Sequence, residues 1–360
     1  MDLARLRIGF LAGTLGQGGS ERQLYYILRT LRQLGCQPHL FSNTQGEFWE
    51  QPIRSLNVPV TWIGKNRSPL ARLLKLHQEL RRLNLDIVQS HHFFTNPYTA
   101  FAARASGKMD VGAIRNDVIT EIQANGPILG QICLKAPRIL AANSMNGICN
   151  AINAGVAVNR LRLLPNIVDC ETFKPLETKK SAEVVLLTIG RLDPQKNQQL
   201  FLQAIARLGR EYNKPVIGRI AGDGPCLTFL KKSRDELGLS EDQFEFLGLV
   251  ADPIPLYQSA DIFILTSDWE GTPNVVMEAM ACGLAVVATR VGGVSDLIED
   301  GKTGLLIEPG NLEMLVEVLI NLIERSDLRE SLGAEARQHI KENCDLATLP
   351  ETLSNFYASL

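Results

Sequence analysis

The chain has 360 residues, which is more than one hydrophobic core usually serves, so we expect two domains. Hydrophobic residues make up 45% and charged residues 21%, an ordinary balance for a soluble globular protein. No apolar run approaches the roughly 20 residues that span a bilayer. The seven cysteines are scattered without a C-x-x-C pair, which argues against a zinc site or a disulfide framework and favours a reducing cytoplasm.

Charge is distributed unevenly along the chain. Residues 1–170 contain 19 Lys and Arg against 10 Asp and Glu, whereas the remainder contains 18 against 29. A basic half joined to an acidic half suggests that the first half meets something anionic, such as phosphate or a membrane surface.

Short β-rich runs alternate with longer helical patterns along the whole chain, which predicts parallel sheets covered on both faces by helices. In the first half the predicted strands are 7–12, 37–42, 58–64, 86–92 and 111–116. After a stretch with two prolines and little periodicity, further strands are predicted at 183–190, 215–222, 244–250, 261–267, 284–289 and 304–309. We therefore expect an α/β protein of two doubly wound domains with a cleft between them. Ligands should bind outside the carboxyl ends of the strands.

A glycine-rich segment, "TLGQGGSERQLYYIL", follows the first predicted strand. Gly16, Gly18 and Gly19 allow the backbone to approach a ligand, and Ser20 is expected to cap the next helix near Glu21. Backbone N–H groups there would hold an anion. A dinucleotide fingerprint, G-x-G-x-x-G, fits poorly because its third glycine position is Glu21. An ordinary tight turn is the other interpretation.

Two cations follow the predicted strand 183–190 in "GRLDPQKN". Arg191 and Lys196 lie five residues apart at the strand end, where they would clamp a diphosphate and stabilise negative charge on a departing phosphate. The alternative is a solvated loop with two ordinary surface cations.

Two glutamates, Glu270 and Glu278, lie eight residues apart in "EGTPNVVMEAMACG". The predicted helix runs from Pro273, in the first helical position, to Cys282 and ends at Gly283. Glu278 lies among apolar residues of this helix, and burying a carboxylate there is costly unless something hydrogen-bonds to it. Two vicinal ribose hydroxyls would do so, and Glu270 would accept from sugar hydroxyls. A core ion pair between Glu278 and a nearby cation is the alternative.

Further candidates lie in the first half. His91 and His92 end one predicted strand, where they would donate to an acceptor or a phosphate or be structural, and Arg115 with Asn116 ends the next. A metal would need more ligands than the histidines provide. Residues 65–82 form a basic helical pattern with a leucine stripe, which would lie on anionic lipid or pack on a sheet with its charges in water.

The tripeptide Gly-Lys-Thr at 301–303 is not a P-loop, because the glycine required at position 296 is Asp296. We predict a turn before a strand there.

Taken together, these segments resemble glycosyltransferase family 4, a large retaining group with the GT-B fold. The resemblance covers most of the chain and is strongest from 185 to 310, where "GRLDPQKN", "IAGDGP", "FLGLV" and the segment around "EGTPNVVMEAMACG" occur in order. The segments "GGSE" and "LPNIVD" extend it toward the N-terminus. The spacing from Glu270 to Glu278 is the family's E-x7-E signature.

The resemblance implies a GT-B architecture of two Rossmann-like domains. Residues 1–170 would form the acceptor-side domain, residues 171–342 the nucleotide-sugar donor domain, and residues 343–360 a helix that crosses back to the first. Glu278 would bind ribose hydroxyls and Glu270 the donor sugar. The other implied donor-binding residues are Gly18, Gly19, Gly190, Arg191 and Lys196 around the diphosphate, Leu249 and Val250 at the base, and Gly271, Thr272, Pro273, Asn274 and Val275 at sugar and phosphate. No D-x-D motif is present, and the group generally works without a metal, so no cofactor is expected besides the donor.

One departure concerns the acceptor side. Many members carry a histidine at the end of the strand that matches 111–116, where this chain has Arg115 and Asn116. A histidine-based role there cannot be carried over.

The resulting hypothesis is a retaining hexosyltransferase that uses a nucleoside-diphosphate sugar, most simply a UDP-sugar such as UDP-glucose. The acceptor would be a hydroxyl of a polysaccharide or glycolipid precursor, with Arg191, Lys196 and Glu270 in catalysis and His91, His92, Arg115 and Asn116 near the acceptor. A nucleotide-sugar epimerase and a non-catalytic nucleotide-sugar-binding homologue are the alternatives. We expect a cytoplasmic protein with peripheral contact to an anionic inner membrane face, and no nucleic-acid partner.

Overall fold

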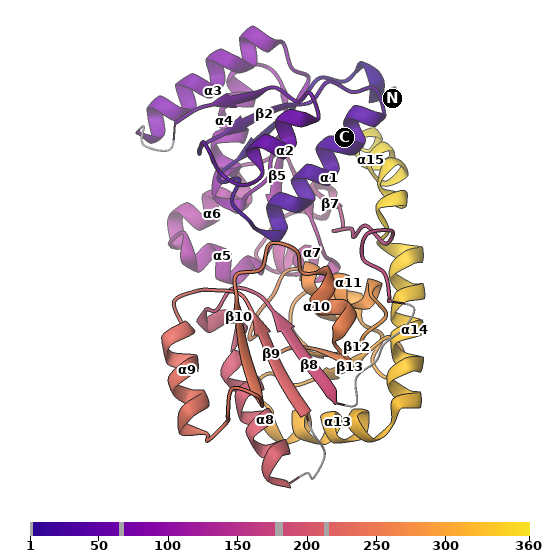
Figure 1. The fold of residues 1–360 in the computed structure, drawn as a ribbon. Coiled ribbons are helices and arrows are strands. Elements are labelled where there is room, and N and C mark those ends of the chain that lie inside the picture. The colour runs from indigo at the N-terminus through magenta and orange to yellow at the C-terminus, as the bar shows by residue number, and fades with distance from the viewer. Residues whose placement is uncertain (1–2, 65–67, 177–182, 212–215) are drawn as a thin grey trace. The chain divides into compact units, whose positions relative to one another are not determined.

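The computed structural model describes residues 3–64, 68–176, 183–211 and 216–360. The chain forms two compact units, one of residues 1–166 with 347–360 and the other of residues 167–346 (Figure 1). The domain boundaries predicted from the sequence lay after residues 170 and 342.

The first unit is built on a seven-stranded parallel sheet with the strand order β3-β2-β1-β4-β5-β6-β7. Its strands are β1 (Ile8–Ala12), β2 (His39–Ser42), β3 (Val60–Trp62), β4 (Ile87–Ser90), β5 (Met109–Ile114), β6 (Ile139–Ala142) and β7 (Leu161–Leu163). Its α-helices are α1 (Gly19–Gln33), α2 (Glu50–Ser55), α3 (Pro69–Leu83), α4 (Asn96–Ala105), α5 (Val118–Ala124), α6 (Pro127–Lys135), α7 (Met145–Asn153) and α15 (Leu349–Ala358). Short 3₁₀ turns are η1 (Leu3–Arg5), η2 (Phe93–Thr95) and η3 (Val158–Arg160).

The second unit has a six-stranded parallel sheet with the order β10-β9-β8-β11-β12-β13. Its strands are β8 (Val184–Ile189), β9 (Val216–Ala221), β10 (Phe244–Gly248), β11 (Ile262–Leu265), β12 (Ala285–Thr289) and β13 (Leu305–Ile307). Its helices are α8 (Gln198–Glu211), α9 (Leu227–Glu236), α10 (Ile254–Ser259), α11 (Asn274–Ala281), α12 (Val294–Leu297), α13 (Leu312–Glu324) and α14 (Ser326–Asn343). The 3₁₀ turn η4 (Pro194–Lys196) follows β8, and η5 (Leu346–Thr348) leads into α15.

Alternating side chains of the second sheet supply two separate cores, one on each face. Leu186 and Ile264 face α8 and α13, which lie side by side (Figure 1). Leu187 and Phe263 face the opposite way, into a core with residues of α11 and α14. Because successive strand residues point to opposite faces, a strand buried on both faces has the continuous apolar pattern seen in the sequence.

The α/β class and the parallel sheets predicted from the sequence are confirmed, and all six strands of the second unit lie where they were predicted. Two strands of the first unit were missed. β6 has four residues, three of them leucine or alanine, and β7 has only three, so neither has the length or the β-branched composition that marks a strand.

The basic helical pattern at 65–82 corresponds to α3, which begins at Pro69. The hydroxyl of Ser68 accepts a hydrogen bond from the backbone N–H of Ala71 and so caps the helix. The beginning of the predicted pattern, residues 65–67, lies outside the described residues. No helix in the described ranges combines the length and the apolar composition needed to cross a membrane.

Candidate functional site

The centre of the site in the second unit is an ion pair between Lys196 and Glu270. Lys196 Nζ donates to Glu270 Oε1 at 2.5 Å, and the Ser267 hydroxyl donates to the same oxygen at 2.6 Å. Glu270 is buried and Lys196 is partly buried. The cation and the hydroxyl together offset the cost of burying this carboxylate.

The two loops that carry this pair are joined by several hydrogen bonds. The loop after β8 and the loop after β11 meet where Thr266 Oγ1 donates to the Lys196 carbonyl at 3.0 Å and Asp268 N donates to the Gln195 carbonyl at 2.8 Å. Gln195 Nε2 also donates to the Trp269 carbonyl at 2.7 Å. These bonds hold the cation and the acid in register at the carboxyl edge of the sheet, where α/β folds bind ligands.

Close backbone contacts at glycines hold neighbouring loops against the same edge. A Cβ on Gly292, which has φ +48°, would lie 1.8 Å from the Glu270 carbonyl oxygen. A Cβ on Gly222 would lie 1.9 Å from the carbonyl oxygen of Gly190. The loops after β9 and β12 therefore lie directly on those after β8 and β11, an approach that only glycine allows.

Arg191 lies in the same loop as Lys196, after β8, with its side chain largely in solvent. Its Nε donates to Asp193 Oδ2 at 2.5 Å, and 72% of the side chain is exposed. Asp193 itself is buried. The acid orients the guanidinium while leaving most of it accessible, so Arg191 can bind an anion without leaving its place.

Glu278 is buried, with 4% of its surface exposed, in the middle of α11. The hydroxyl of Tyr257, a fully buried residue of α10, donates to Glu278 Oε2 at 2.9 Å. Burial first, and the negative charge of Glu278 second, raise the pKa of the nearby Cys282 thiol to about 12. An ion pair was the alternative predicted from the sequence, and one partner that the structure shows is the phenol of Tyr257.

The start of α11 differs from the prediction by one residue. Pro273 is the N-cap, with extended ψ of 114°, and Asn274 is the first helical residue. Proline has no N–H to offer, so either position suits it, and here the turn after Gly271 extends one residue further. Val275 is partly buried, and Gly271 accepts a hydrogen bond from Gly293 N at 2.9 Å.

The residues predicted to contact a base follow β10. Leu249 is 70% exposed, an unusual position for a leucine, and Val250 is partly buried. The preceding Gly248 accepts a hydrogen bond from Gly222 N at 2.7 Å, which places this loop next to the one after β9.

In the first unit, the glycine-rich loop leads into α1 by a different cap from the one predicted. Gly18 is the N-cap and Gly19 the first helical residue, so Ser20 lies inside the helix. A Cβ on Gly18 would lie 2.3 Å from Glu21 Oε2, because the Glu21 side chain folds back over the helix start. A negative side chain at this position is favoured by the helix dipole.

Both predicted histidines bind this helix start. His91 is fully buried and its Nε2 donates to the Ser20 carbonyl at 2.7 Å. Burial, then Arg115 and His92, hold the pKa of His91 well below its usual range, so the ring is neutral. His92 accepts at Nδ1 from Gly13 N at 3.0 Å, and its Nε2 faces Glu21 Oε1 at 3.2 Å. The protein thus uses both ring nitrogens of His92, in the manner of a structural histidine.

Arg115 is partly buried at the end of β5, as is Asn116. Its Nη1 donates to Asn166 Oδ1 at 3.2 Å, and burial lowers the pKa of Arg115 to about 10. Its Nε and Nη2 are buried and have no hydrogen-bond partner among the described residues. These two atoms form the side of a guanidinium that binds carboxylates and phosphates in a fork.

Within the described ranges, no three His, Cys, Asp or Glu side chains gather as metal ligands. The Gly-Lys-Thr sequence forms a turn around Gly301 before β13, as predicted.

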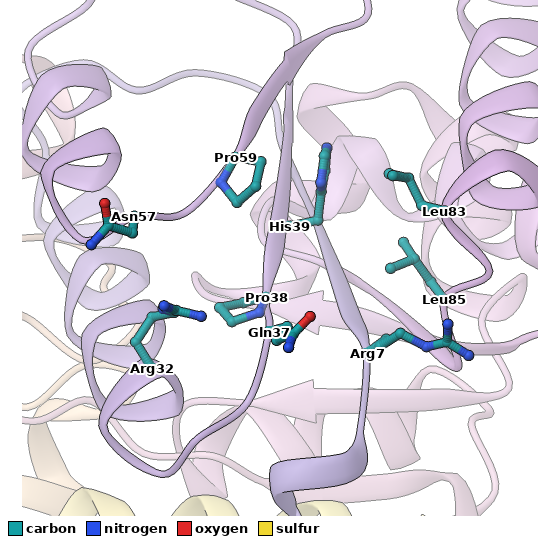
Figure 2. A pocket seen from close by; sticks show the side chains of 9 residues that line it. All are labelled: Arg7, Arg32, Gln37, Pro38, His39, Asn57, Pro59, Leu83 and Leu85. Atoms are coloured by element: carbon teal, nitrogen blue, oxygen red, sulfur yellow. The ribbon is translucent and has the colours of Figure 1, made fainter.

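A cavity of about 330 Å³ lies at the opposite, amino edge of the first sheet (Figure 2). Its lining residues are Arg7, Arg32, Gln37, Pro38, His39, Asn57, Pro59, Leu83 and Leu85. Figure 2 shows Leu83 and Leu85 on one side of His39 and the two prolines on the other. None of the predicted site residues lines it, so it is separate from the candidate site.

The pairing partners were not found from the sequence. Ser267 has a weak signal, since it ends a predicted strand three residues before Glu270. Tyr257 lies in a short helix 21 residues from Glu278 and carries no signal of its own. Glu21 was predicted to lie near the start of the helix, but its contact with His92 was not predicted.

Comparison with known proteins agrees with the fold. Residues 170–339 match the glycosyl transferases group 1 family, and residues 17–172 match glycosyltransferase family 4. A Campylobacter jejuni N-acetylgalactosamine-N,N'-diacetylbacillosaminyl-diphospho-undecaprenol 4-alpha-N-acetylgalactosaminyltransferase is 27% identical over 93% of this chain and 95% of its own. The sulfoquinovosyl transferase SQD2 of Arabidopsis thaliana is 27% identical over 90% of this chain and 67% of its own.

Among solved structures, Anabaena Alr3699/HepE in complex with UDP and glucose has a TM-score of 0.88 and 22% identity over 99% of this chain and 100% of its own. The two family matches together span residues 17–339. The chain therefore belongs to the group 1 glycosyltransferases, and its two parallel-sheet units have the GT-B fold.

Proposed function

We propose that this enzyme transfers a hexose-type sugar from a UDP-sugar, such as UDP-glucose, to a hydroxyl of a polysaccharide or glycolipid precursor, with retention of configuration at the anomeric carbon. The observation that carries the proposal is the arrangement of Arg191, Lys196 and Glu270 at the carboxyl edge of the second sheet. Two cations held in place by acids can bind a diphosphate, and the adjoining carboxylate can accept hydrogen bonds from sugar hydroxyls.

The proposed roles follow the position of each group. Arg191 and Lys196 bind the diphosphate, and Glu270 accepts hydrogen bonds from the donor sugar while holding Lys196 in place. Glu278 accepts from the ribose hydroxyls, and the backbone at Gly190 and from Gly271 to Val275 contacts phosphate and sugar. Leu249 and Val250 contact the base. Contacts of Gly18 and Gly19 with the diphosphate stay a prediction.

In the proposed mechanism the bond between the anomeric carbon and the phosphate oxygen breaks, and the electron pair leaves with the diphosphate. The acceptor hydroxyl adds on the same face, and its proton passes to the departing phosphate oxygen. Arg191 and Lys196 stabilise the negative charge on that oxygen as it develops.

The donor and acceptor classes are supported by the relatives. The Anabaena protein was solved with UDP and with glucose, and the name of the Campylobacter enzyme contains a diphospho-undecaprenol acceptor. On the acceptor side we assign Arg115, whose buried Nε and Nη2 suit an anionic group, with Asn116 beside it. His91 and His92 hold the start of α1 on that side.

Incubation of the purified protein with UDP-glucose, UDP-N-acetylglucosamine and GDP-mannose, with and without hydroxyl acceptors, tests the proposal. We expect UDP release that depends on the acceptor and, by NMR, a product with the donor's anomeric configuration. Conversion of the donor sugar without an acceptor would indicate an epimerase, and binding without turnover a non-catalytic homologue.

We propose further that the reaction needs no metal and takes place in the cytoplasm at the inner membrane face. Addition of EDTA should leave the rate unchanged. A rate that falls with EDTA and returns with Mg²⁺ would contradict the first statement.

A further inference from the structure

The helical hairpin of α5 and α6 in the first unit exposes an unusual number of large apolar side chains. The two helices lie side by side (Figure 1). The exposed fractions are 57% for Ile119, 78% for Ile128, 51% for Leu129 and 39% for Ile132. Single exposed apolar residues are common, but a group of four on one hairpin marks an interaction surface.

These side chains are exposed although the hairpin itself is firmly packed. Val118, Cys133 and Leu134, on its inner face, belong to a buried core with residues of β5 and β6. α6 also lies very close to α5, since a Cβ on Gly130 would lie 2.4 Å from the Ile122 carbonyl oxygen. The apolar residues therefore belong to a rigid face of the first unit, and no described part of that unit covers them.

Charge is distributed around the hairpin in a second, independent pattern. Residues 118–134 contain one charged residue, Glu121, which is partly buried. Directly after them, the turn from α6 to β6 is basic. Lys135 and Arg138 are exposed there, and Arg104 and Arg160 donate to backbone carbonyls of the same turn. One acid, Asp110, lies within 4 Å of Arg104 and Arg138, so these four cations keep an excess of positive charge. An apolar face beside a basic edge is complementary to the acyl boundary and the anionic headgroups of a bilayer.

The rival surface, α3, fits less well. Leu70 and Leu74 are exposed on it, but two of its cations are already paired within the helix. Lys75 Nζ lies 2.7 Å and Arg82 Nη2 2.8 Å from oxygens of the Glu79 carboxylate. Arg104 and Arg138 beside the hairpin are also paired, with Asp110, so the number of exposed apolar side chains decides between the two surfaces, two on α3 and four on the hairpin.

We propose that the α5–α6 hairpin docks the enzyme on an anionic membrane surface, with Ile119, Ile128, Leu129 and Ile132 entering the acyl boundary. The proposal rests on the proposed function in one respect, a lipid-linked acceptor presented at the same surface. The hairpin begins at the N-cap Asp117, two residues after Arg115. The docking surface therefore adjoins the residue that we assign to an anionic acceptor group.

The test compares two matched double variants of the full chain, Ile128→Asn with Leu129→Asn, and Leu70→Asn with Leu74→Asn. Co-sedimentation is measured with vesicles of phosphatidylcholine alone and of phosphatidylcholine mixed with phosphatidylglycerol. We expect wild type to bind the mixed vesicles. The α6 variant should bind them ~100-fold more weakly, since it loses two apolar side chains that contribute about 10-fold each. The α3 variant should bind within about 2-fold of wild type.

Folding and function are monitored separately. Circular dichroism and UDP binding by calorimetry should be the same in both variants as in wild type, because every substituted side chain is exposed and lies outside the donor site. Equal vesicle binding by wild type and the α6 variant would overturn the proposal, as would binding lost only in the α3 variant. So would a wild-type dimer that becomes monomeric in the α6 variant while vesicle binding is unchanged. None of these results would affect the proposed sugar transfer, which is measured with a water-soluble acceptor.

Discussion

Replacing Glu278 by Gln tests the assignment of the buried acid to the ribose. The two side chains have nearly the same shape, and the carbonyl oxygen of Gln can still accept the Tyr257 hydroxyl, which lies 2.9 Å from Glu278 Oε2. The substitution removes the negative charge and one acceptor oxygen. Whatever depends on a carboxylate accepting from two vicinal hydroxyls should therefore be lost.

The expected loss is large. A hydrogen bond to a charged group contributes about 1.5–3 kcal/mol net. Loss of the ribose bonds to Glu278 should thus cost about 2–4 kcal/mol of binding, which is roughly a 30- to 1000-fold rise in the Kd of UDP. Wild type should also bind 2′-deoxy-UDP roughly 10- to 150-fold more weakly than UDP, whereas Glu278→Gln should bind the two nucleotides about equally.

Tyr257→Phe is the matched control. It removes the same hydrogen bond from the other side but keeps the ring, whose centroid lies 6.0 Å from that of Phe173 and 5.8 Å from that of Phe263. We expect this variant to lose about 1.5–3 kcal/mol of folding stability, or about 3–12 °C in Tm for a unit of this size, with a smaller change in UDP affinity. Calorimetry gives the affinities and thermal unfolding the stabilities. If Glu278→Gln bound UDP like wild type and still preferred it to the 2′-deoxy analogue, the ribose assignment would be wrong and Glu278 would be a structural partner of Tyr257.

The remaining predictions concern charge, backbone space and pH. Alanine at Arg191 or Lys196 should raise the barrier by about 2–4 kcal/mol, seen as a fall in kcat, and normal turnover in either variant would refute the role of that cation. Gly292→Ala should destabilise the protein by about 3 kcal/mol or more, because its Cβ would lie 1.8 Å from the Glu270 carbonyl oxygen. Gly301→Ala, at φ +79° with no atom within 4 Å of its Cβ, should cost only about 1 kcal/mol. Equal losses of stability in the two variants on chemical unfolding would contradict this reasoning. Burial lowers the pKa of His39 to about 4 in the folded protein. Between pH 6.5 and 4 the unfolded chain therefore binds a proton at this histidine that the folded chain does not bind. The folding stability falls as the pH drops through that range. His39→Gln should lose less Tm than wild type between pH 8 and pH 5, and parallel losses would exclude this histidine as the cause.

Positions along the chain were easier to predict from the sequence than contacts. β8 and β11 are apolar runs that end in polar residues or glycine, so their carboxyl ends, and with them Arg191, Lys196 and Glu270, could be placed on one edge of a sheet. The same reasoning placed His91 and His92 after a strand. These are consequences of local periodicity and of the shared direction of parallel strands.

The pairing of those residues depends on packing between segments far apart in sequence. Lys196 and Glu270 meet because two loops are hydrogen-bonded to each other, and the periodicity of either strand contains no information about that. The histidines are similar, since their partners lie about 70 residues away at the start of α1. The cap of α1 was predicted at Ser20 because serine is a strong N-cap residue. In the structure the cap lies two residues earlier, at Gly18, with the Glu21 side chain folded back over it.

The return of α15 to the first unit has a consequence for biosynthesis. Leu349, Leu353, Phe356 and Tyr357 are buried there, and the Tyr357 hydroxyl donates to Gln89 Oε1 at 2.7 Å. On the ribosome these residues emerge only after the whole second unit has been synthesised. The apolar surface of the first unit that α15 covers therefore stays exposed to solvent until synthesis ends. We therefore expect a chaperone that binds the nascent chain to bind the apolar surface that α15 later covers.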